Sequence, residues 1–256
     1  MKFRSLILLP IILFACNTDK NEAQTTESEF YNGTPTKEVN YRTSDGITIF
    51  ADLVEQGKAG RTIILFHQAG ANGRSEYRNV VPRLYKEDFN LLIVDQRSGG
   101  QRFGEYNRTV AAITENYEYC EAYPDFVASV DFLRTEGYTG DIMVWGSSYS
   151  AALAIQLAAN HKEVHSALAF SPASGGPMEA CSPNPYIESM SKPLMVLRPA
   201  REMEVESVAD QFELAKANER VTYIAENGVH GSSMLDPSRT KSDVEDTWKA
   251  VLNFLN

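Results

Sequence analysis

The sequence predicts an α/β fold, a three-layer sandwich in which helices cover both faces of a mostly parallel sheet of eight strands. Apolar runs alternate with segments of helical periodicity, which is the pattern of repeated β-α units. The runs Ile63–Phe66 and Leu91–Val94 are apolar at every position, as expected of parallel strands covered on both faces. The residues Ser44-Asp45-Gly46 form a hairpin turn between the first two strands, so the sheet should begin antiparallel.

The elements are expected to follow one another in a single domain from residue 38 to residue 256. The predicted strands are Glu38–Thr43, Ile47–Glu55, Thr62–Phe66, Asn90–Val94, Asp141–Trp145, His165–Phe170, Leu194–Arg198 and Arg220–Ile224. The predicted helices are Glu76–Lys86, Ala122–Thr135, Ser148–Ala159, Ser207–Asn218 and Ser242–Leu255. Only the short segment Ser171–Met190 joins the sixth and seventh strands, which leaves no room for a large lid domain.

The composition is that of an ordinary globular protein. Of the 256 residues, 43% are apolar and 23% are charged, which excludes collagen-like, disordered and coiled-coil chains. The net charge is −10, and no basic stripe interrupts the acidic chain. This balance argues against binding to nucleic acid and against electrostatic docking on anionic lipid.

Residues 1–15 are predicted to be a signal peptide of the lipoprotein type. A basic head, Met1–Arg4, precedes the apolar run Ser5–Ala15, which is too short to cross about 30 Å of hydrocarbon as a helix. The run ends in Leu13-Phe14-Ala15-Cys16, which resembles a bacterial lipobox and makes Cys16 the acylated first residue of the mature chain. The alternative is an ordinary cleaved signal in which Cys16 has no role.

The residues that follow are expected to tether the body to a membrane. Residues 16–37 are polar and have few apolar anchors, which favours a flexible segment. A lipid anchor at Cys16 predicts a location in the cell envelope, on the periplasmic or the outer-membrane face. Cleavage after residue 15 removes two basic residues, Lys2 and Arg4, and no acid, so the net charge of −10 becomes −12.

Two cysteines remain in the body, Cys120 and Cys181. Beyond the inner membrane the compartment is oxidising, so an even pair favours a disulfide. The alternative is a pair of buried, inert thiols.

The residues after the fifth strand suggest a nucleophile. The strand Asp141–Trp145 is followed by Gly146-Ser147-Ser148-Tyr149-Ser150 and then by the helix-forming run Ala151–Ala154. This is the G-x-S-x-G nucleophile elbow with Ser150 in place of the last glycine, a small change because serine adds only a hydroxymethyl group. The motif makes Ser148 the candidate nucleophile. A serine-rich helix N-cap would explain the serines but not the apolar strand before them.

A catalytic serine needs a neighbouring base and a carboxylate that orients this base. His230 follows the last strand in a glycine-flanked loop and is the candidate base, whereas His67 is interpreted as a structural residue. Glu202 lies four residues past the strand Leu194–Arg198 and is the candidate acid, with Glu204 as the runner-up.

An oxyanion hole requires backbone N–H donors. The first should be Tyr149, at the start of the helix after the elbow, where the helix dipole also favours negative charge. The second should come from the loop after the third strand, where Ala69 is the first choice and Gln68 the alternative.

No cofactor and no metal are predicted. His161 and His165 are four residues apart, but the segment lacks the H-E-x-x-H order of zinc peptidases and lies between a helix end and a strand start. The chain also has no glycine-rich dinucleotide or phosphate loop.

These motifs resemble those of the α/β-hydrolase superfamily, of the esterase and dienelactone-hydrolase type, over about residues 38–256. The resemblance rests on His67-Gln68-Ala69-Gly70, on Asp95–Gly100 after the fourth strand, on the elbow and on the Ser–acid–His order. It implies a serine hydrolase that cleaves small-molecule carboxylic esters through an acyl-enzyme. Since this fold supports many chemistries, two alternatives stay open: a serine peptidase of the same fold, and a binding lipoprotein without turnover.

Overall fold

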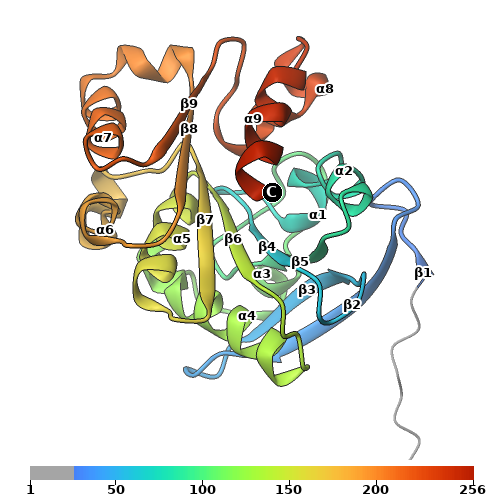
Figure 1. The fold of residues 1–256 in the computed structure, drawn as a ribbon. Helices are drawn as coiled ribbons and strands as arrows, with labels where there is room; N and C mark the ends of the chain where they lie inside the picture. The colour runs from blue at the N-terminus through green and yellow to red at the C-terminus, as the bar shows by residue number, and fades with distance from the viewer. Residues whose placement is uncertain (1–25) are drawn as a thin grey trace, which may run out of the picture.

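The computed structural model describes residues 26–256, so the expected signal peptide and Cys16 lie outside the described residues. One sheet runs through the molecule in the strand order β1-β2-β3-β5-β4-β6-β7-β8-β9 (Figure 1). The strands are β1 (Thr26–Glu27), β2 (Pro35–Arg42), β3 (Thr48–Val54), β4 (Thr62–Phe66), β5 (Asn90–Asp95), β6 (Ile142–Ser147), β7 (Val164–Phe170), β8 (Leu194–Pro199) and β9 (Val221–Ala225).

The pairing of the strands confirms a mostly parallel sheet with an antiparallel start. The strands β1, β2, β3 and β5 pair antiparallel in that order, and each pair from β5 across to β9 is parallel. The predicted eight strands correspond to β2–β9, and β1 adds two residues at the antiparallel edge.

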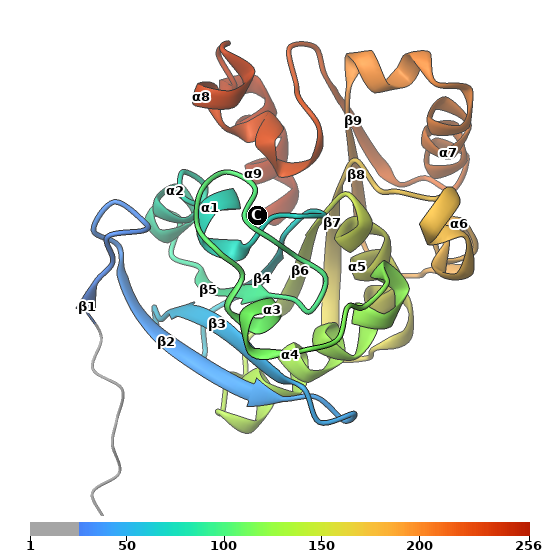
Figure 2. The ribbon, with the colours of Figure 1, turned by 180° about the vertical axis from the view of Figure 1, so that it is seen from behind.

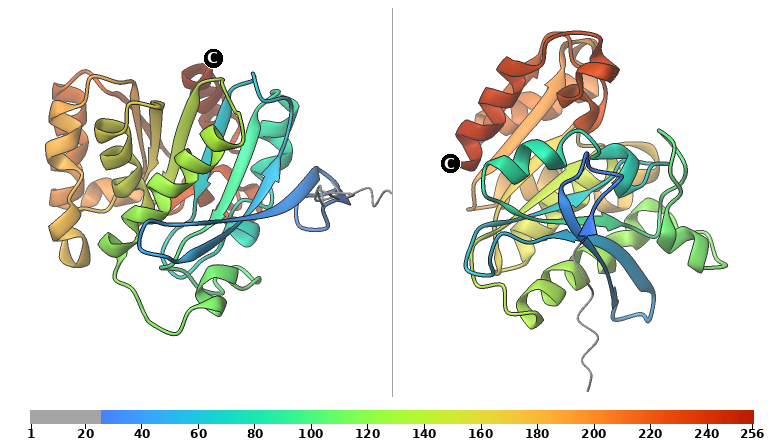
Figure 3. Two further views of the ribbon diagram at one scale, coloured as in Figure 1. Left: turned by 90° about the horizontal axis from the view of Figure 1, so that it is seen from below. Right: turned by 90° about the vertical axis from the view of Figure 1, so that its right-hand side faces the viewer.

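Helices cover both faces of this sheet (Figures 2 and 3). The α-helices are α1 (Gly73–Glu76), α2 (Val81–Lys86), α3 (Arg108–Ala112), α4 (Tyr123–Thr135), α5 (Tyr149–Asn160), α6 (Asn184–Ser189), α7 (Glu206–Ala217), α8 (Pro237–Thr240) and α9 (Glu245–Leu255). Short 3₁₀ helices are η1 (Tyr119–Ala122), η2 (Gly176–Cys181), η3 (Ala200–Glu204) and η4 (Gly231–Leu235). Among residues 26–256, no helix has the length and apolar character needed to cross a membrane.

Two apolar cores lie on either side of the sheet, because successive residues of a strand point to opposite faces. In β4, Ile64 and Phe66 pack into the core that is covered by α4, α5, α6 and α7. Their neighbours Ile63 and Leu65 pack into the other core, which is covered by α2 and α9. Both faces of β4 are therefore buried, which explains its unbroken apolar run.

The predicted helix Glu76–Lys86 is wrong as a single element. The structure has two short helices here, α1 and α2, with a turn between them. Pro82 lies in the first turn of α2, and proline has no N–H to continue a helix from before it. Because α1 ends at Glu76, this residue can bind Gln68 in the loop that follows β4.

The packed body begins before residue 38. Tyr31 is fully buried, and its hydroxyl donates to Asp52 Oδ2 over 2.8 Å. The Arg74 guanidinium lies 4.1 Å from the centre of the Phe30 ring. Part of the segment expected to be a tether, from β1 onward, is thus attached to the edge of the sheet.

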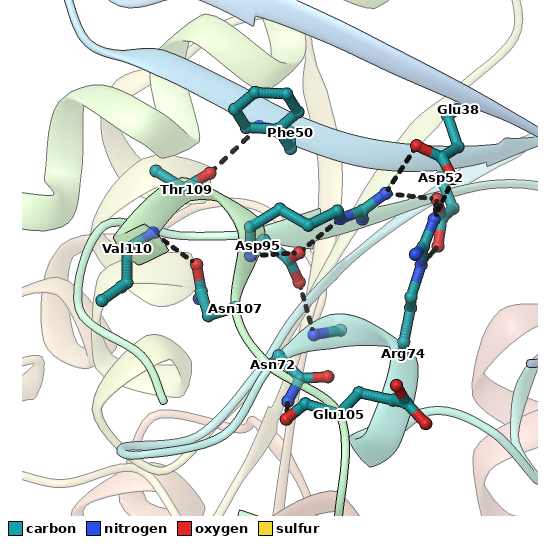
Figure 4. A network of polar contacts seen from close by, with 12 residues as sticks. Glu38, Phe50, Asp52, Asn72, Arg74, Asp95, Glu105, Asn107, Thr109 and Val110 are labelled. Atoms are coloured by element: carbon teal, nitrogen blue, oxygen red, sulfur yellow. Dashed lines mark hydrogen bonds and ion pairs between the residues drawn. The ribbon is translucent and has the colours of Figure 1, made fainter. Parts of the chain in front are cut away.

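Asp52, the partner of Tyr31, belongs to a buried network of ion pairs (Figure 4). The Asp52 carboxylate accepts hydrogen bonds from Arg74 Nε at 2.8 Å and from Arg108 Nη1 at 2.7 Å. Arg108 Nε also donates to Asp95 Oδ2 at 2.7 Å, and Asp95 Oδ1 accepts from Gly73 N at 2.8 Å. The network joins β3, β5, α1 and α3, and gives Asp95 of the predicted Asp95–Gly100 turn a structural role.

Candidate active site

The predicted catalytic residues gather at the carboxyl ends of the parallel strands, where ligands bind in open α/β sheets. Ala69 follows β4, Ser148 follows β6, Glu202 follows β8 and His230 follows β9. Since β4, β6, β7, β8 and β9 are successive neighbours in the sheet, their outgoing loops lie at one edge.

Ser148 occupies a sharp turn between β6 and α5. Its backbone has φ 63° and ψ −119°, a conformation that L-residues rarely adopt and that marks stored strain. Gly146 makes the turn possible, because a Cβ there would collide with the Ser150 carbonyl and with Ala151. The turn raises the Ser148 side chain out of the sheet, and Ser148 is only partly buried.

Ser150, which replaces the last glycine of the motif, has a structural role. Its Oγ accepts a hydrogen bond from Ser147 N at 2.8 Å and lies 2.7 Å from the carbonyl oxygen of Phe66, to which it donates. The hydroxyl therefore joins the elbow to the end of β4. The substitution is more than a tolerated side chain, because it adds hydrogen bonds that glycine lacks.

Glu202 and His230 are in direct contact. Glu202 Oε1 lies 2.6 Å from His230 Nδ1, whereas Glu204 is exposed. The same carboxylate accepts from Ser171 Oγ and from Arg198 Nη1, each at 3.0 Å. Burial alone would raise the pKa of Glu202, but the His230 hydrogen bond and the charges of His230 and Arg198 lower it below its ordinary value.

Among the hydrogen bonds of residues 26–256, none joins His230 to Ser148. Their chain neighbours do touch, since Ser232 N donates to Ser147 Oγ over 2.9 Å. The structure thus pairs Glu202 with His230 and places Ser148 on a neighbouring turn. The His230 side chain is 47% exposed, so its ring opens onto the surface beside the elbow.

The two candidate N–H donors after β4 differ in their partners. Gln68 N donates to Glu76 Oε2 at 2.7 Å and is therefore already engaged. Ala69 N, in the next peptide, has no acceptor among the described residues. Tyr149 is the first residue of α5, where the backbone N–H has no partner within the helix. Ala69 and Tyr149 are therefore the donors free to bind an oxyanion.

His67 is held inside the protein as a structural residue. Its side chain is fully buried, with Nδ1 2.9 Å from the Gln68 carbonyl oxygen, to which it donates. Its Nε2 accepts from Gln96 N at 3.1 Å and lies 3.0 Å from Asn107 Nδ2. Burial lowers the pKa of His67, which favours the neutral ring that these contacts require.

An open cavity of about 400 Å³ adjoins His230. Its lining includes Gln68, Phe103 and three arginines, Arg102, Arg201 and Arg239. Arg239 pairs with Asp236 over 3.4 Å and stacks its guanidinium 3.7 Å from the Phe103 ring centre. Arg102 and Arg201 form no ion pair within the part of the chain that the structure describes. A concentration of positive charge thus lies beside the candidate base.

The predicted disulfide joins Cys120 of η1 to Cys181 of η2. The residue before it, Tyr119, stacks on Tyr149 with ring centres 4.7 Å apart. Because Tyr149 follows the candidate nucleophile, the bridge holds η1 and η2 together beside the start of α5.

Sequence reasoning missed three buried residues that support the site, namely Ser171, Arg198 and Glu76. Ser171 and Arg198 both lie at the carboxyl end of a parallel strand, which is the place where functional residues were sought. A charged arginine at the end of an apolar strand is itself a signal, because a buried charge must be paired. No local pattern marks Glu76.

A parallel sheet with a serine in a strained strand-to-helix turn, and with a carboxylate–histidine pair after its last two strands, defines the class of the α/β hydrolases. Residues 48–256 match the profile of the dienelactone hydrolase family, and the chain belongs to this family. The family and its esterase relatives support a hydrolase. A search of curated proteins finds no match.

Several solved structures share the fold. An esterase of Pyrococcus furiosus has a TM-score of 0.66 and 20% identity, with 86% of this chain and 90% of that chain covered. A putative dienelactone hydrolase of Klebsiella pneumoniae has a TM-score of 0.61 and 12% identity, with 86% and 98% covered. The acylaminoacyl peptidase of Pyrococcus horikoshii has a TM-score of 0.62 and 15% identity, with 91% of this chain but only 42% of that chain covered. At these identities the likeness shows the fold alone.

Proposed function

We propose that this protein is a serine hydrolase that cleaves carboxylic esters through a Ser148–His230–Glu202 triad and an acyl-enzyme. The observation that carries the proposal is the 2.6 Å contact between Glu202, which follows β8, and His230, which follows β9. The loop that carries His230 lies beside the strained Ser148 turn. A binding protein would not need an oriented imidazole next to a serine held in this conformation. Membership of the dienelactone hydrolase family supports the same chemistry.

In this mechanism the Ser148 hydroxyl attacks the ester carbonyl while His230 Nε2 accepts its proton. The oxyanion of the tetrahedral intermediate receives hydrogen bonds from Tyr149 N and Ala69 N. His230 then gives the proton to the leaving alcohol, and the acyl group stays on Ser148 Oγ. Water, deprotonated by the same imidazole, attacks the acyl-enzyme; the bond to Ser148 Oγ breaks, the carboxylic acid leaves, and the imidazolium returns its proton to Ser148 Oγ. Glu202 orients the ring and stabilises its cation at both stages.

The favoured substrate is a small ester that carries a negative charge. Arg102 and Arg201 line the cavity beside His230 without an acidic partner in the described chain. In a protein of net charge −10, these arginines favour binding of an anionic substrate at this cavity over the rest of the surface, which repels anions.

A serine peptidase of the same fold is the second candidate, favoured by the fold shared with acylaminoacyl peptidase. That likeness covers only 42% of the peptidase chain. Amide substrates tested beside esters of the same acyl group distinguish the two candidates. An amine leaving group depends more strongly than an alcohol on the proton that His230 donates.

The experiment that tests the proposal is labelling of residues 26–256 with a fluorophosphonate, followed by peptide mapping. A single adduct on Ser148, absent in Ser148→Ala, is expected together with loss of ester hydrolysis. The exposed serine variant Ser189→Ala is the matched control and should be labelled like the parent. A folded protein that takes no adduct would favour the binding lipoprotein instead.

We further propose that Cys16 carries a lipid and anchors the enzyme in the cell envelope. The lipobox-like segment Leu13–Cys16 supports this. The full chain expressed in a bacterium should partition into the membrane fraction and move to the soluble fraction in Cys16→Ala. Equal partition of both proteins would argue against the anchor.

A further inference from the structure

One buried carboxylate beside the site takes no part in the proposed chemistry. Glu76 ends helix α1 and is only 2% exposed. A carboxylate is rarely buried unless it is well bonded, because leaving water is costly for a charge. Its partners therefore indicate what it does for the protein.

The first partner is the loop that supplies the oxyanion donor. Glu76 Oε2 accepts from Gln68 N at 2.7 Å, and Oε1 accepts from Gln68 Nε2 at 3.3 Å. The carboxylate thus binds both the backbone and the side chain of one residue. The Gln68 peptide is fixed in this way, and the N–H of the next residue, Ala69, has no acceptor among residues 26–256.

The second partner is the strand that carries the nucleophile. Burial raises the pKa of Glu76, and the nearby Ser147 hydroxyl is foremost among the groups that oppose this rise. Ser147 is fully buried and immediately precedes Ser148. Glu76 therefore lies beside the end of β6, where the chain turns into the elbow.

The third partner, reached through Ser147, is the loop of the candidate base. Ser147 Oγ accepts from Ser232 N at 2.9 Å. Gly231, the residue after His230, packs so closely on Ser147 Oγ that a Cβ there would collide with it. Arg239 reinforces the junction, because it donates to Ser75 O at 2.6 Å and to Ser233 Oγ at 2.8 Å.

We propose that Glu76 is a positioning residue that holds the oxyanion loop, the nucleophile turn and the histidine loop in one arrangement for the transition state. It touches neither substrate nor reacting atoms and acts through Gln68 and Ser147. The inference rests on the proposed ester hydrolysis. Its role differs from that of Glu202, which orients the imidazole directly.

The test compares Glu76→Ala and Glu76→Gln with the parent protein on one activated ester. Removal of one oxyanion donor costs roughly 100- to 1,000-fold in kcat in other hydrolases. Glu76→Ala should therefore lower kcat by about 100-fold, while KM changes by less than about threefold, because Arg102 and Arg201 of the cavity do not contact Glu76. Glu76→Gln keeps an acceptor for Gln68 N and should recover much of this loss.

A trifluoromethyl ketone that forms a tetrahedral adduct on the serine gives a second readout. Its affinity should fall in proportion to kcat/KM across the variants, since it reports the same oxyanion geometry. The losses of kcat/KM caused by substitutions of Ser147 and of Glu76 should also be less than additive in the double variant, because both residues act through one network.

Asp52→Asn is the matched control, since Asp52 is an equally buried carboxylate in the network of Figure 4. It should lower Tm and leave kcat per folded molecule unchanged. The inference is overturned if folded Glu76→Gln and Glu76→Ala keep the parent kcat, or if both raise KM alone. Should Glu76→Ala not fold, Glu76→Gln is the test, and the inference is overturned if this variant keeps both the parent kcat and the parent inhibitor affinity. A parent protein that neither hydrolyses esters nor takes a fluorophosphonate would instead overturn the proposed function.

Discussion

At the scale of single residues, the site depends on how one carboxylate is shared. Glu202 accepts hydrogen bonds from His230, Ser171 and Arg198. The serine and the arginine hold the carboxylate in place, so it can present a fixed oxygen to the ring. Ser171 Oγ also accepts from Gly231 N at 3.0 Å, which ties the acid to the loop that carries the base.

Glu202→Gln should reduce kcat by about 1,000- to 10,000-fold, the order seen when the acid of a serine triad becomes an amide. An amide can present its N–H to the ring, which favours the wrong tautomer of His230. Steady-state kinetics on an activated ester measures the loss. Glu204→Gln is the matched control, since Glu204 is exposed, and it should retain the parent kcat. Equal losses in both variants would contradict the assignment of Glu202.

The lowered pKa of Glu202 also predicts a pH dependence of stability. A carboxyl whose pKa is lower in the folded state stabilises the protein above its unfolded pKa of about 4.3, and this contribution disappears as pH falls through the folded pKa. The difference in free energy of unfolding between the parent and Glu202→Gln should therefore be largest near neutrality and shrink below about pH 4. Denaturant titrations at several pH values measure it. A difference that is constant with pH would show that the ionised carboxylate does not contribute.

At the scale of elements, a covalent bond joins two short helices near the candidate nucleophile. The disulfide closes a separation of 61 residues between η1 and η2. Both helices pack near the start of α5, with Tyr119 of η1 stacked on Tyr149. The bridge therefore restrains these two helices beside α5 more than it restrains the sheet.

The variant Cys120→Ser/Cys181→Ser should stay folded and bind substrate less well. Loss of a disulfide typically costs about 2–4 kcal/mol, which a domain with two large cores can tolerate. We expect KM to rise several-fold while kcat changes little, because Glu202 and His230 lie outside the bridged segment and the Ser148 turn is held between β6 and α5. Kinetics and thermal unfolding on the same sample measure the two effects. An unchanged KM would mean that the η1–η2 wall does not contact the substrate.

At the scale of the whole molecule, charge is unevenly distributed. The chain carries a net charge of −10, yet three arginines line the cavity beside His230. Fields of this kind raise the local concentration of anions at a cleft and weaken with salt. The substrate preference should therefore be electrostatic in origin.

An ester with a carboxylate should have a lower KM than its uncharged isostere, and the difference should narrow as salt is added. Arg102→Ala should raise KM for the anionic ester by roughly threefold to tenfold, as expected for about 1 kcal/mol of charge interaction. Lys86→Ala is the control of equal charge change, because Lys86 lies at the end of α2, next to the amino end of β5. The same KM for both esters would refute the preference.

The sequence alone determined the order of strands and helices and the loops that carry Ser148, His230 and the acid. These features follow from backbone periodicity and from local motifs, which a single chain displays without tertiary contacts. For the same reason it missed the break between α1 and α2, where a turn placed by packing divides a helical pattern.

Only the tertiary structure decided between alternatives that share one loop. Glu202 rather than Glu204 meets His230 because of the course of η3. Gln68 N is bonded to Glu76, whereas Ala69 N has no acceptor within the described part of the chain. Packing also decided that Cys120 and Cys181, which are 61 residues apart in the chain, are bridged and are not two separate thiols. Such choices depend on which segments pack together, and no local periodicity encodes that contact.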